Sequence, residues 1–240
     1  MQARIAPEVL ELLGQASTAT LTTQLFKRGL RNTFLAGVGP LNEGSSRMVG
    51  EAFTLRFIPA REDLDVMEAF DDYDHPQRKA IESVGPGQVL IMDCRQQGRA
   101  ACAGEILATR LMRRGAVGLV TDGSLRDSPE IARLPMPVFT GGVSPTTNLA
   151  QHHAVDMQIP IGCAGVAVYP GDVLVGDEEG VVCVPRHLAE EIAAPGAEQE
   201  RMEAFILSKV NQGAALRGTY PPDEQTREEY RKLIHGANPS

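Results

Sequence analysis

This 240-residue sequence lacks the marks of a disulfide-bonded or membrane-spanning protein. It has no Cys-x-x-Cys pair and only four widely spaced cysteines, so we expect reduced thiols at Cys94, Cys102, Cys163 and Cys183. No apolar run approaches the roughly 20 residues that cross a bilayer, and the N-terminus has no basic region followed by an apolar one. We therefore expect a cytoplasmic protein with no membrane partner.

A positive net charge is also missing. The chain has 23 lysines and arginines against 31 aspartates and glutamates, a formal net charge of −8 at pH 7. Such a chain has little broad electrostatic affinity for polyanions, so we expect no nucleic acid partner. A nucleotide-binding glycine loop after a strand is absent as well, which leaves methyl transfer with little support.

Neither a repeat nor a convincing linker divides the sequence. Its length suffices to bury a substantial core without metal or disulfide staples. We predict a single α/β/β catalytic domain over residues 1–211, followed over residues 212–240 by a C-terminal tail with a short charged helix.

The most informative stretch is a strand-helix-strand pattern in the middle of the chain. Gln88–Asp93 and Ala116–Asp122 are short apolar runs typical of buried strands. Glu105–Arg114 lies between them, contains no glycine or proline and consists largely of good helix formers, and Gly115 is placed to end that helix. In a right-handed crossover, the start of the helix and the carboxyl end of the second strand lie at the same sheet edge. Glu105 is therefore expected to face the turn that carries Arg126 and Asp127, at an edge where α/β sheets generally bind ligands.

Further β-rich runs surround this crossover. Strands are expected over residues 50–59, 137–140, 158–168, 172–176 and 180–185. Helices are expected over residues 7–13, 17–27 and 187–210, the last with a break at Pro195-Gly196. Several closely spaced strands after a crossover indicate an α/β fold with α/β/β layers rather than a pure doubly wound sheet.

Two further clusters carry polar side chains. Residues 61–77 are crowded with acids, which could supply oxygen ligands to a cation, but their spacing fits no EF-hand and favours a solvated surface. His152 and His153 are adjacent and point in different directions in any regular element, so a paired metal site is not predicted there.

Three segments together resemble the RraA-like family. The family signature is similar to a pattern in this chain in which Gly104-Glu105 is followed, after twenty residues, by Arg126-Asp127. Cys163–Pro185 is similar to the usual end of the family's core, and Ser17–Thr23 to its N-terminal helix. The family includes class II pyruvate aldolases that act on 4-hydroxy-4-methyl-2-oxoglutarate, and also regulators that inhibit ribonuclease E. The resemblance implies an α/β/β swivelling-type fold, assembled as a homotrimer or homohexamer with active sites between subunits.

The resemblance also implies a role for each residue of the signature. Asp127 would hold Mg²⁺, Mn²⁺ or another divalent cation, with water at most of the remaining positions. Arg126 would bind the keto acid and offset enolate charge. The substrate carboxylate would be held by the backbone amides around Gly104, Glu105, Ile106 and Leu107. The family commonly has aspartate where this chain has Glu105, whose extra methylene lengthens its reach toward a water for proton transfer.

Elementary chemistry agrees with these roles but leaves alternatives open. The first amides of a helix suit a carboxylate, an arginine fork suits a carboxylate or enolate, and one carboxylate with several waters often holds Mg²⁺. Equally, Asp127 could cap the next helix, Arg126 could pair with a surface acid, and Glu105 could serve only the helix dipole.

The leading hypothesis is a metal-dependent lyase, an aldolase or decarboxylase, that cleaves a small 4-hydroxy-2-oxo acid or oxaloacetate to pyruvate. One alternative is a sugar-acid dehydratase or related keto-acid enzyme. Another is a non-catalytic protein regulator of ribonuclease E.

Overall fold

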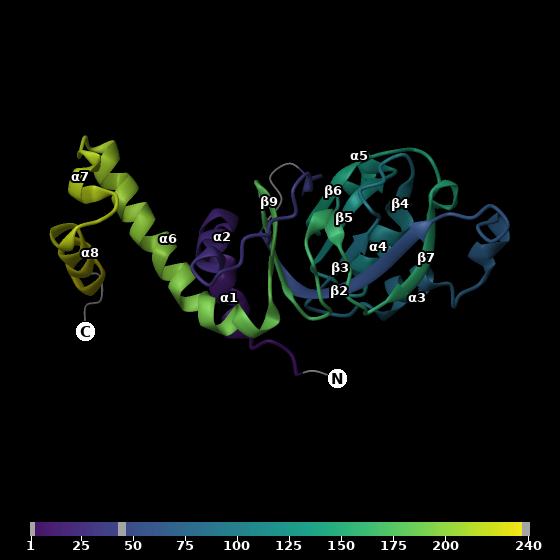
Figure 1. Ribbon diagram of the computed structural model, residues 1–240, viewed down its shortest axis with the longest axis horizontal. Helices are drawn as coiled ribbons and strands as arrows, with labels where there is room; N and C mark the ends of the chain where they lie inside the picture. Colours follow the sequence, from purple (N-terminus) through teal and green to yellow (C-terminus); the bar gives the residue numbers. More distant parts are fainter. Residues whose placement is uncertain (1–2, 43–46, 237–240) are drawn as a thin grey trace.

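The predicted crossover lies at the centre of a mixed sheet that carries helices on both sides (Figure 1). The computed structural model describes residues 3–42 and 47–236. Residues 1–2, 43–46 and 237–240 of the predicted domain and tail lie outside this description. The strands are β1 (Gly39–Pro40), β2 (Met48–Pro59), β3 (Gln88–Asp93), β4 (Ala101–Ala103), β5 (Gly118–Leu125), β6 (Val138–Val143), β7 (His152–Met157), β8 (Val173–Asp177) and β9 (Gly180–Val184).

The helices fall into two groups separated by the sheet (Figure 1). The α-helices are α1 (Pro7–Gln15), α2 (Thr18–Phe26), α3 (Pro76–Ser83), α4 (Glu105–Arg113), α5 (Ser128–Ile131), α6 (Ala189–Asn211), α7 (Leu216–Thr219) and α8 (Glu224–Gly236). Short 3₁₀ turns are η1 (Met67–Asp71), η2 (Asn148–Ala150), η3 (Cys163–Gly165) and η4 (Arg186–Leu188).

The sheet has the order β1-β6-β5-β3-β2-β8-β9, with β4 beside β5 and β7 beside β2. Strands β2, β3, β5 and β6 run parallel, whereas β1, β7, β8 and β9 pair antiparallel with their neighbours. The sheet curls until its two ends approach one another. At this junction the Leu35 N–H, before β1, donates to the Val181 carbonyl of β9 at 2.9 Å. The predicted α/β fold with a central crossover is confirmed.

Three apolar clusters fill this architecture. One lies between the sheet and α3, α4 and α5, and it includes one face of β2: Phe53, Leu55 and Phe57. A second lies within the curl of the sheet, around Ile91, Val120 and Phe139. The third packs β8 and β9 against α1, α2 and α6. Side chains are therefore buried on both faces of the parallel strands, as their continuous apolar sequences require.

Two local predictions were wrong. Residues 158–168 do not form a strand, and contain only the turn η3 and an isolated bridge between Ile161 and Val168. The chain turns left-handed at Gln158 and Ala164, which interrupts any ladder. Helix α6 is also unbroken at Pro195. The Glu191 carbonyl, which loses its partner because proline has no N–H, lies 3.5 Å from a guanidinium nitrogen of Arg28 that donates to it.

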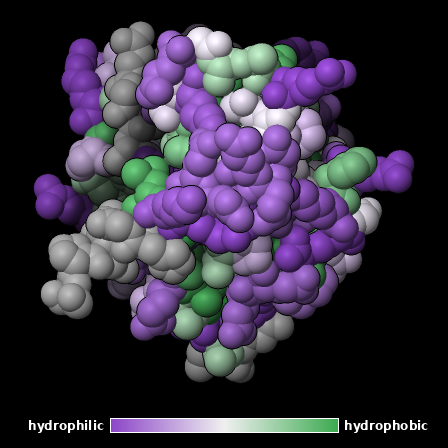
Figure 2. Space-filling view, turned by 90° about the vertical axis from the view of Figure 1, so that its left-hand side faces the viewer, coloured by the Kyte–Doolittle hydropathy of each residue, from purple (hydrophilic) through white to green (hydrophobic). Residues whose placement is uncertain are grey.

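The long helix α6 runs away from the sheet and carries α7 and α8 at its far end (Figure 1). Viewed toward this end, the surface is predominantly hydrophilic (Figure 2), with single exposed apolar side chains such as Leu207, Leu216 and Leu233. The division of the chain at residue 211 stays a prediction. Within the described ranges, no helix combines the length and apolarity that a membrane crossing requires.

The buried Asp177 at the end of β8 fastens helix α2 to the sheet. Its carboxylate accepts the Thr18 N–H and the Thr18 hydroxyl, each at 2.8 Å, and the Glu179 N–H at 3.0 Å. Ser17 caps the same helix by accepting the Thr20 N–H at 3.1 Å. Two independent side chains therefore satisfy the start of α2.

We expect Thr18→Val to lower the free energy of unfolding by about 1–3 kcal/mol, because it leaves a buried carboxylate oxygen short of a donor. Thr23→Val on the same helix is the matched control, since it removes an exposed hydroxyl that donates to Ala19 and should cost less than about 0.5 kcal/mol. Urea unfolding of both variants measures the difference. Equal losses would show that the Asp177 contact does not stabilise the fold.

Candidate functional site

The edge that the crossover creates carries the residues of the predicted site. Strand β5 ends at Leu125, and the Arg126 N–H donates to the Ala103 carbonyl of β4 at 3.1 Å. Asp127 then turns left-handed, with φ 55° and ψ 35°, a conformation that aspartate tolerates better than most residues. The short strand β4 therefore brings the residues before α4 alongside the turn after β5.

The Asp127 carboxylate reaches across to the start of α4. Its Oδ2 accepts the Glu105 N–H at 3.2 Å and lies 3.5 Å from Arg126 Nε. The Asp127 side chain makes no capping hydrogen bond to α5, the helix that follows it. The alternative role considered for Asp127, capping the next helix with its side chain, is therefore not what the structure shows.

Gly104 makes this approach possible. A Cβ at this position would lie 2.6 Å from Asp127 Oδ2 and 3.0 Å from Arg126 Cγ. Real Cβ atoms essentially never come within 3.0 Å of another heavy atom, so a side chain at position 104 would force the Asp127 carboxylate to move, and the Arg126 side chain would have to give by a few tenths of an ångström. The sequence singled out Gly104 for its backbone amide, whereas the structure adds a steric reason for glycine.

Glu105 differs from its neighbours in the site. Its N–H is already engaged by Asp127, and its side chain is exposed and is not among those that line the pocket described below. Ile106 and Leu107 do line that pocket. Their N–H groups belong to the first turn of α4, where a helix offers amides with no intrahelical acceptor. The role of Glu105 in proton transfer stays a prediction.

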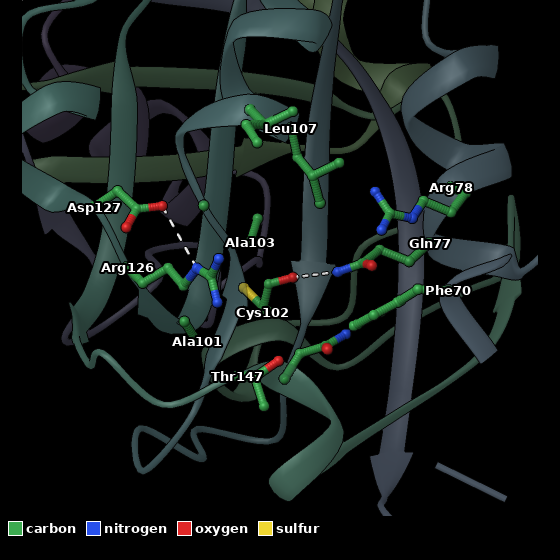
Figure 3. A pocket seen from close by; sticks show the side chains of 13 residues that line it. Phe70, Gln77, Arg78, Ala101, Cys102, Ala103, Leu107, Arg126, Asp127 and Thr147 are labelled. Atoms are coloured by element: carbon green, nitrogen blue, oxygen red, sulfur yellow. Dashed lines mark hydrogen bonds and ion pairs between the residues drawn. The ribbon is translucent and has the colours of Figure 1, made fainter. Parts of the chain in front are cut away.

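A pocket of about 140 Å³ lies beside these residues (Figure 3). Its floor is β4, and one wall is formed by the first turn of α4 together with Arg126 and Asp127. The opposite wall comes from η1, α3 and η2, and its residues are Phe70, Gln77, Arg78, Thr147 and Asn148. This volume is below the range of about 300–1,000 Å³ for sites that hold drug-sized molecules, so the pocket suits a small ligand.

Sequence reasoning did not single out any individual residue of the opposite wall. Gln77 donates to the Cys102 carbonyl and is fixed by that bond, while the Arg78 guanidinium lies over the Phe70 ring at 4.9 Å from its centroid. Asn148 is buried. No short motif links these residues to Arg126, because their proximity depends on the tertiary fold. Their only signal was the acid-rich segment that ends beside Gln77.

The two adjacent histidines point in different directions, as the sequence predicts. His152 is buried and its Nε2 lies 3.1 Å from the Ala100 carbonyl, whereas His153 lies on the other face of β7, 2.8 Å from Asp65. The four cysteines are free and buried. Across residues 3–42 and 47–236, no group of three or more histidine, cysteine or acidic side chains is arranged to hold a metal.

Burial shifts the ionisation of several groups around the pocket. It is the main cause of the lowered pKa of His75, to which the nearby Arg78 charge adds, and of the lowered pKa of His152. Burial also raises the pKa of Asp122, although backbone N–H groups of Ala164, Cys94 and Gln96 donate to its carboxylate and act in the opposite direction.

Asp127 fits the chemistry of a divalent cation ligand. Its side chain is 43% exposed, and Oδ1 has no hydrogen-bond donor among the residues that the structure describes. Mg²⁺ usually keeps several waters and binds through one or two carboxylates together with substrate oxygens. A site with one carboxylate at the rim of a small pocket is compatible with this requirement.

Comparison with known proteins identifies the family. The family model RraA-like, described as Aldolase/RraA, matches residues 18–183. The chain belongs to the RraA-like family. It is 30% identical over 142 residues to the 4-hydroxy-4-methyl-2-oxoglutarate aldolase of Thermus thermophilus, covering 59% of this chain and 78% of that protein.

Two further proteins match more of the chain. Protein DlpA of Legionella pneumophila is 25% identical over 93% of this chain, which spans only 34% of that relative. The crystal structure of Streptomyces coelicolor RraAS2, described as an unusual member of the RNase ES inhibitor RraA protein family, superposes with a TM-score of 0.78. The two chains are 30% identical, and the superposition covers 86% of this chain and 100% of RraAS2.

The lowered pKa of His75 predicts a dependence of stability on pH. The unfolded chain protonates this imidazole near its ordinary pKa of 6.5, whereas the folded protein does so only at lower pH. Protonation therefore favours unfolding, and stability is lost as the pH falls below about 6.5. We expect the free energy of unfolding to drop more between pH 7.5 and pH 5.5 in the wild type than in His75→Gln. The same pH dependence in both proteins, measured by urea unfolding, would contradict this.

Proposed function

We infer that this protein is a divalent-metal-dependent lyase that cleaves a small 4-hydroxy-2-oxo acid or oxaloacetate to pyruvate. The observation that carries the proposal is the pairing of Asp127 and Arg126 at the rim of a small pocket, beside the first turn of α4. The name of the Thermus thermophilus relative supports the same class of reaction.

The residues of the site divide the work of substrate binding. The first-turn amides of Ile106 and Leu107 suit the substrate carboxylate, because helix N-termini bind anions. Arg126 reaches the 2-oxo end of the substrate with a planar guanidinium that matches carboxylate and enolate oxygens. Asp127 would hold the metal ion, which when bound supplies Lewis-acid stabilisation of the developing enolate charge.

The reaction needs one bond to break and one proton to be delivered. The bond between C3 and C4 of the substrate breaks, and its electron pair moves toward the C2 carbonyl to give the enolate of pyruvate. The other product is a carbonyl compound in aldol cleavage, where the 4-hydroxyl proton would pass to the water that Glu105 orients, or carbon dioxide in decarboxylation. A water oriented by Glu105 then delivers a proton to C3, which yields pyruvate.

Assembly belongs to the same proposal. Ile106 and Val143, two large apolar side chains at this sheet edge, expose 78% and 58% of their surface. A homotrimer or homohexamer with sites between subunits would cover them. Divalent cofactor, keto-acid substrate and neighbouring subunits would then meet at one place.

Two other functions use the same chain differently. A sugar-acid dehydratase would share the enolate and expel a hydroxyl group instead of breaking a carbon-carbon bond. A regulator of ribonuclease E would act by protein contact. The similarity to Streptomyces coelicolor RraAS2, a member of the RNase ES inhibitor family, is the observation that favours testing this second role.

We expect pyruvate release from oxaloacetate or from 4-hydroxy-2-oxo acids to require Mg²⁺ or Mn²⁺ and to stop with chelator. Asp127→Asn should reduce kcat/KM at least about 100-fold, because loss of the charged ligand removes several kcal/mol of transition-state stabilisation. Asparagine tolerates the left-handed backbone, so the unfolding temperature should change little. Failure of the wild type to release pyruvate from any of these acids, together with inhibition of ribonuclease E by Asp127→Asn, would favour the regulator instead.

Gly104→Ala should impair the same activity without contacting substrate. The added methyl group displaces Asp127 and Arg126, so we expect a loss of at least about 10-fold in kcat/KM, the scale on which misplacing supporting groups weakens such sites. Gly162→Ala is the control, because nothing lies within 4 Å of the position that its new methyl group would occupy, and its activity should match the wild type. Similar activity in both variants would show that the close approach at Gly104 is not required.

A further inference from the structure

Residues 61–74, called the wall segment here, contribute Phe70 to the pocket but are held to the rest of the fold by few contacts. In the part of the chain that the structure describes, backbone N–H groups of this segment donate only to acceptors within it. Its large apolar side chains Leu64, Met67 and Tyr73 are exposed, Tyr73 by 90%. Segments with local hydrogen bonds and few buried apolar contacts open at a low free-energy cost.

Two side-chain contacts attach the wall segment to β7 and to the start of α3. The buried Asp65 carboxylate lies 2.8 Å from His153 Nδ1 of β7. The Phe70 ring has the Arg78 guanidinium 4.9 Å from its centroid, and the His75 ring lies edge-on to it at 6.2 Å. Phe70 and Arg78 lie together on one side of the pocket (Figure 3). The position of Phe70 in the pocket therefore depends on its packing against α3 and the residue before it.

His75, the residue before α3, has no place for a second N–H while the wall segment is closed. Its side chain is buried, and its Nδ1 is inaccessible to solvent and has no hydrogen-bond partner among the described residues. A protonated imidazole carries a donor on both ring nitrogens, so the Nδ1 donor would stay unpaired. His153 differs, because its Nδ1 has the Asp65 carboxylate beside it. Charging His75 therefore costs free energy that opening of the wall segment relieves.

The charges around His75 come from three elements. Arg78 on α3 and His153 on β7 oppose a positive charge at His75, whereas Asp65 and Asp72 of the wall segment favour one. Burial is the largest cause of the lowered pKa of His75, and the two opposing groups add to it. The closed arrangement is therefore favoured while His75 is neutral, above its ordinary pKa of 6.5, and is lost progressively as the pH falls below that value.

We propose that residues 61–74 form a proton-sensitive wall of the pocket, which opens when His75 becomes protonated and carries Phe70 away from the pocket. With a neutral imidazole, His75 and Phe70 pack edge-on and the pocket keeps its small volume. With a charged imidazole, opening gives the second N–H of His75 water as an acceptor and lets solvent screen its charge from that of Arg78. This wall acts on the shape of the pocket, whichever ligand binds there.

Hydrogen exchange at pH 7.5 and pH 5.5, corrected for the intrinsic exchange rate at each pH, measures this opening without metal or substrate. We expect the protection of the amides of residues 61–74 to fall at least about threefold at pH 5.5. The ceiling is about 10-fold, because pH 5.5 lies one unit below the ordinary pKa of His75. Amides of the buried strand β3 should keep their protection, which separates local opening from global unfolding. Unchanged protection of residues 61–74 would overturn the proposal.

Two variants without an imidazole test whether His75 is the responsible group. In His75→Gln and His75→Leu, the protection of residues 61–74 should be the same at both pH values, and the second variant serves if the first does not fold. His187→Gln is the matched control, because His187 is exposed and lines a separate cavity, so it should behave like the wild type. A fall of wild-type size in either His75 variant would contradict the proposal.

Removal of single charges gives effects of opposite sign, which a purely structural role would not. Asp72→Asn removes a negative charge that favours the proton on His75, so the fall in protection between pH 7.5 and pH 5.5 should grow toward the ceiling. Asparagine keeps the oxygen that accepts the Asp74 N–H. Arg78→Met removes a positive charge that opposes the proton, so the fall should shrink. Changes in the same direction in both variants would show that loosening of the segment, rather than protonation, governs its opening.

A ligand that needs the closed wall should suppress opening, and this last measurement rests on the proposed function. Oxalate with Mg²⁺ serves as the probe, at 10 times its dissociation constant at each pH. The protection of residues 61–74 should rise about 10-fold at either pH, by mass action on the closed state. If protection rises around Asp127 but not in residues 61–74, the wall does not close on the ligand and the proposal fails. If oxalate protects neither region, the proposed function loses support while the pH effect stands.

Discussion

The hydrogen bond from the Glu105 N–H to the Asp127 carboxylate is the contact on which the candidate site depends. It joins the start of a crossover helix to the turn after the following strand. Two local conditions make it possible: Asp127 is left-handed, and Gly104 has no side chain in the space between them. The geometry of the Asp127 contact is therefore set by the sheet edge.

This part of the molecule could be predicted because its signals are local. Apolar runs marked β3 with its observed bounds, good helix formers marked α4 to within one residue, and Gly115 marked the end of that helix. The handedness of crossovers then sufficed to place Glu105 opposite Asp127. The steric role of Gly104 did not follow, because it depends on where the Asp127 side chain lies rather than on any sequence pattern.

The features that sequence missed depend on contacts between distant segments. Residues 158–168 have a β-rich composition, but N–H groups of Gly162 and Ala164 donate to Asp93 and Asp122 rather than to a neighbouring strand. Helix α6 continues through Pro195 because Arg28 donates to the freed carbonyl. Arg78 and Asn148 reach the pocket from segments far apart in the chain, which no spacing rule connects.

The charge of the pocket differs from the charge of the chain as a whole. The net charge of −8 repels polyanions at long range, whereas the pocket presents two arginines at close range to a ligand small enough to enter it. The two ends are not equivalent, because Arg126 has Asp127 beside it while Arg78 stacks only on Phe70.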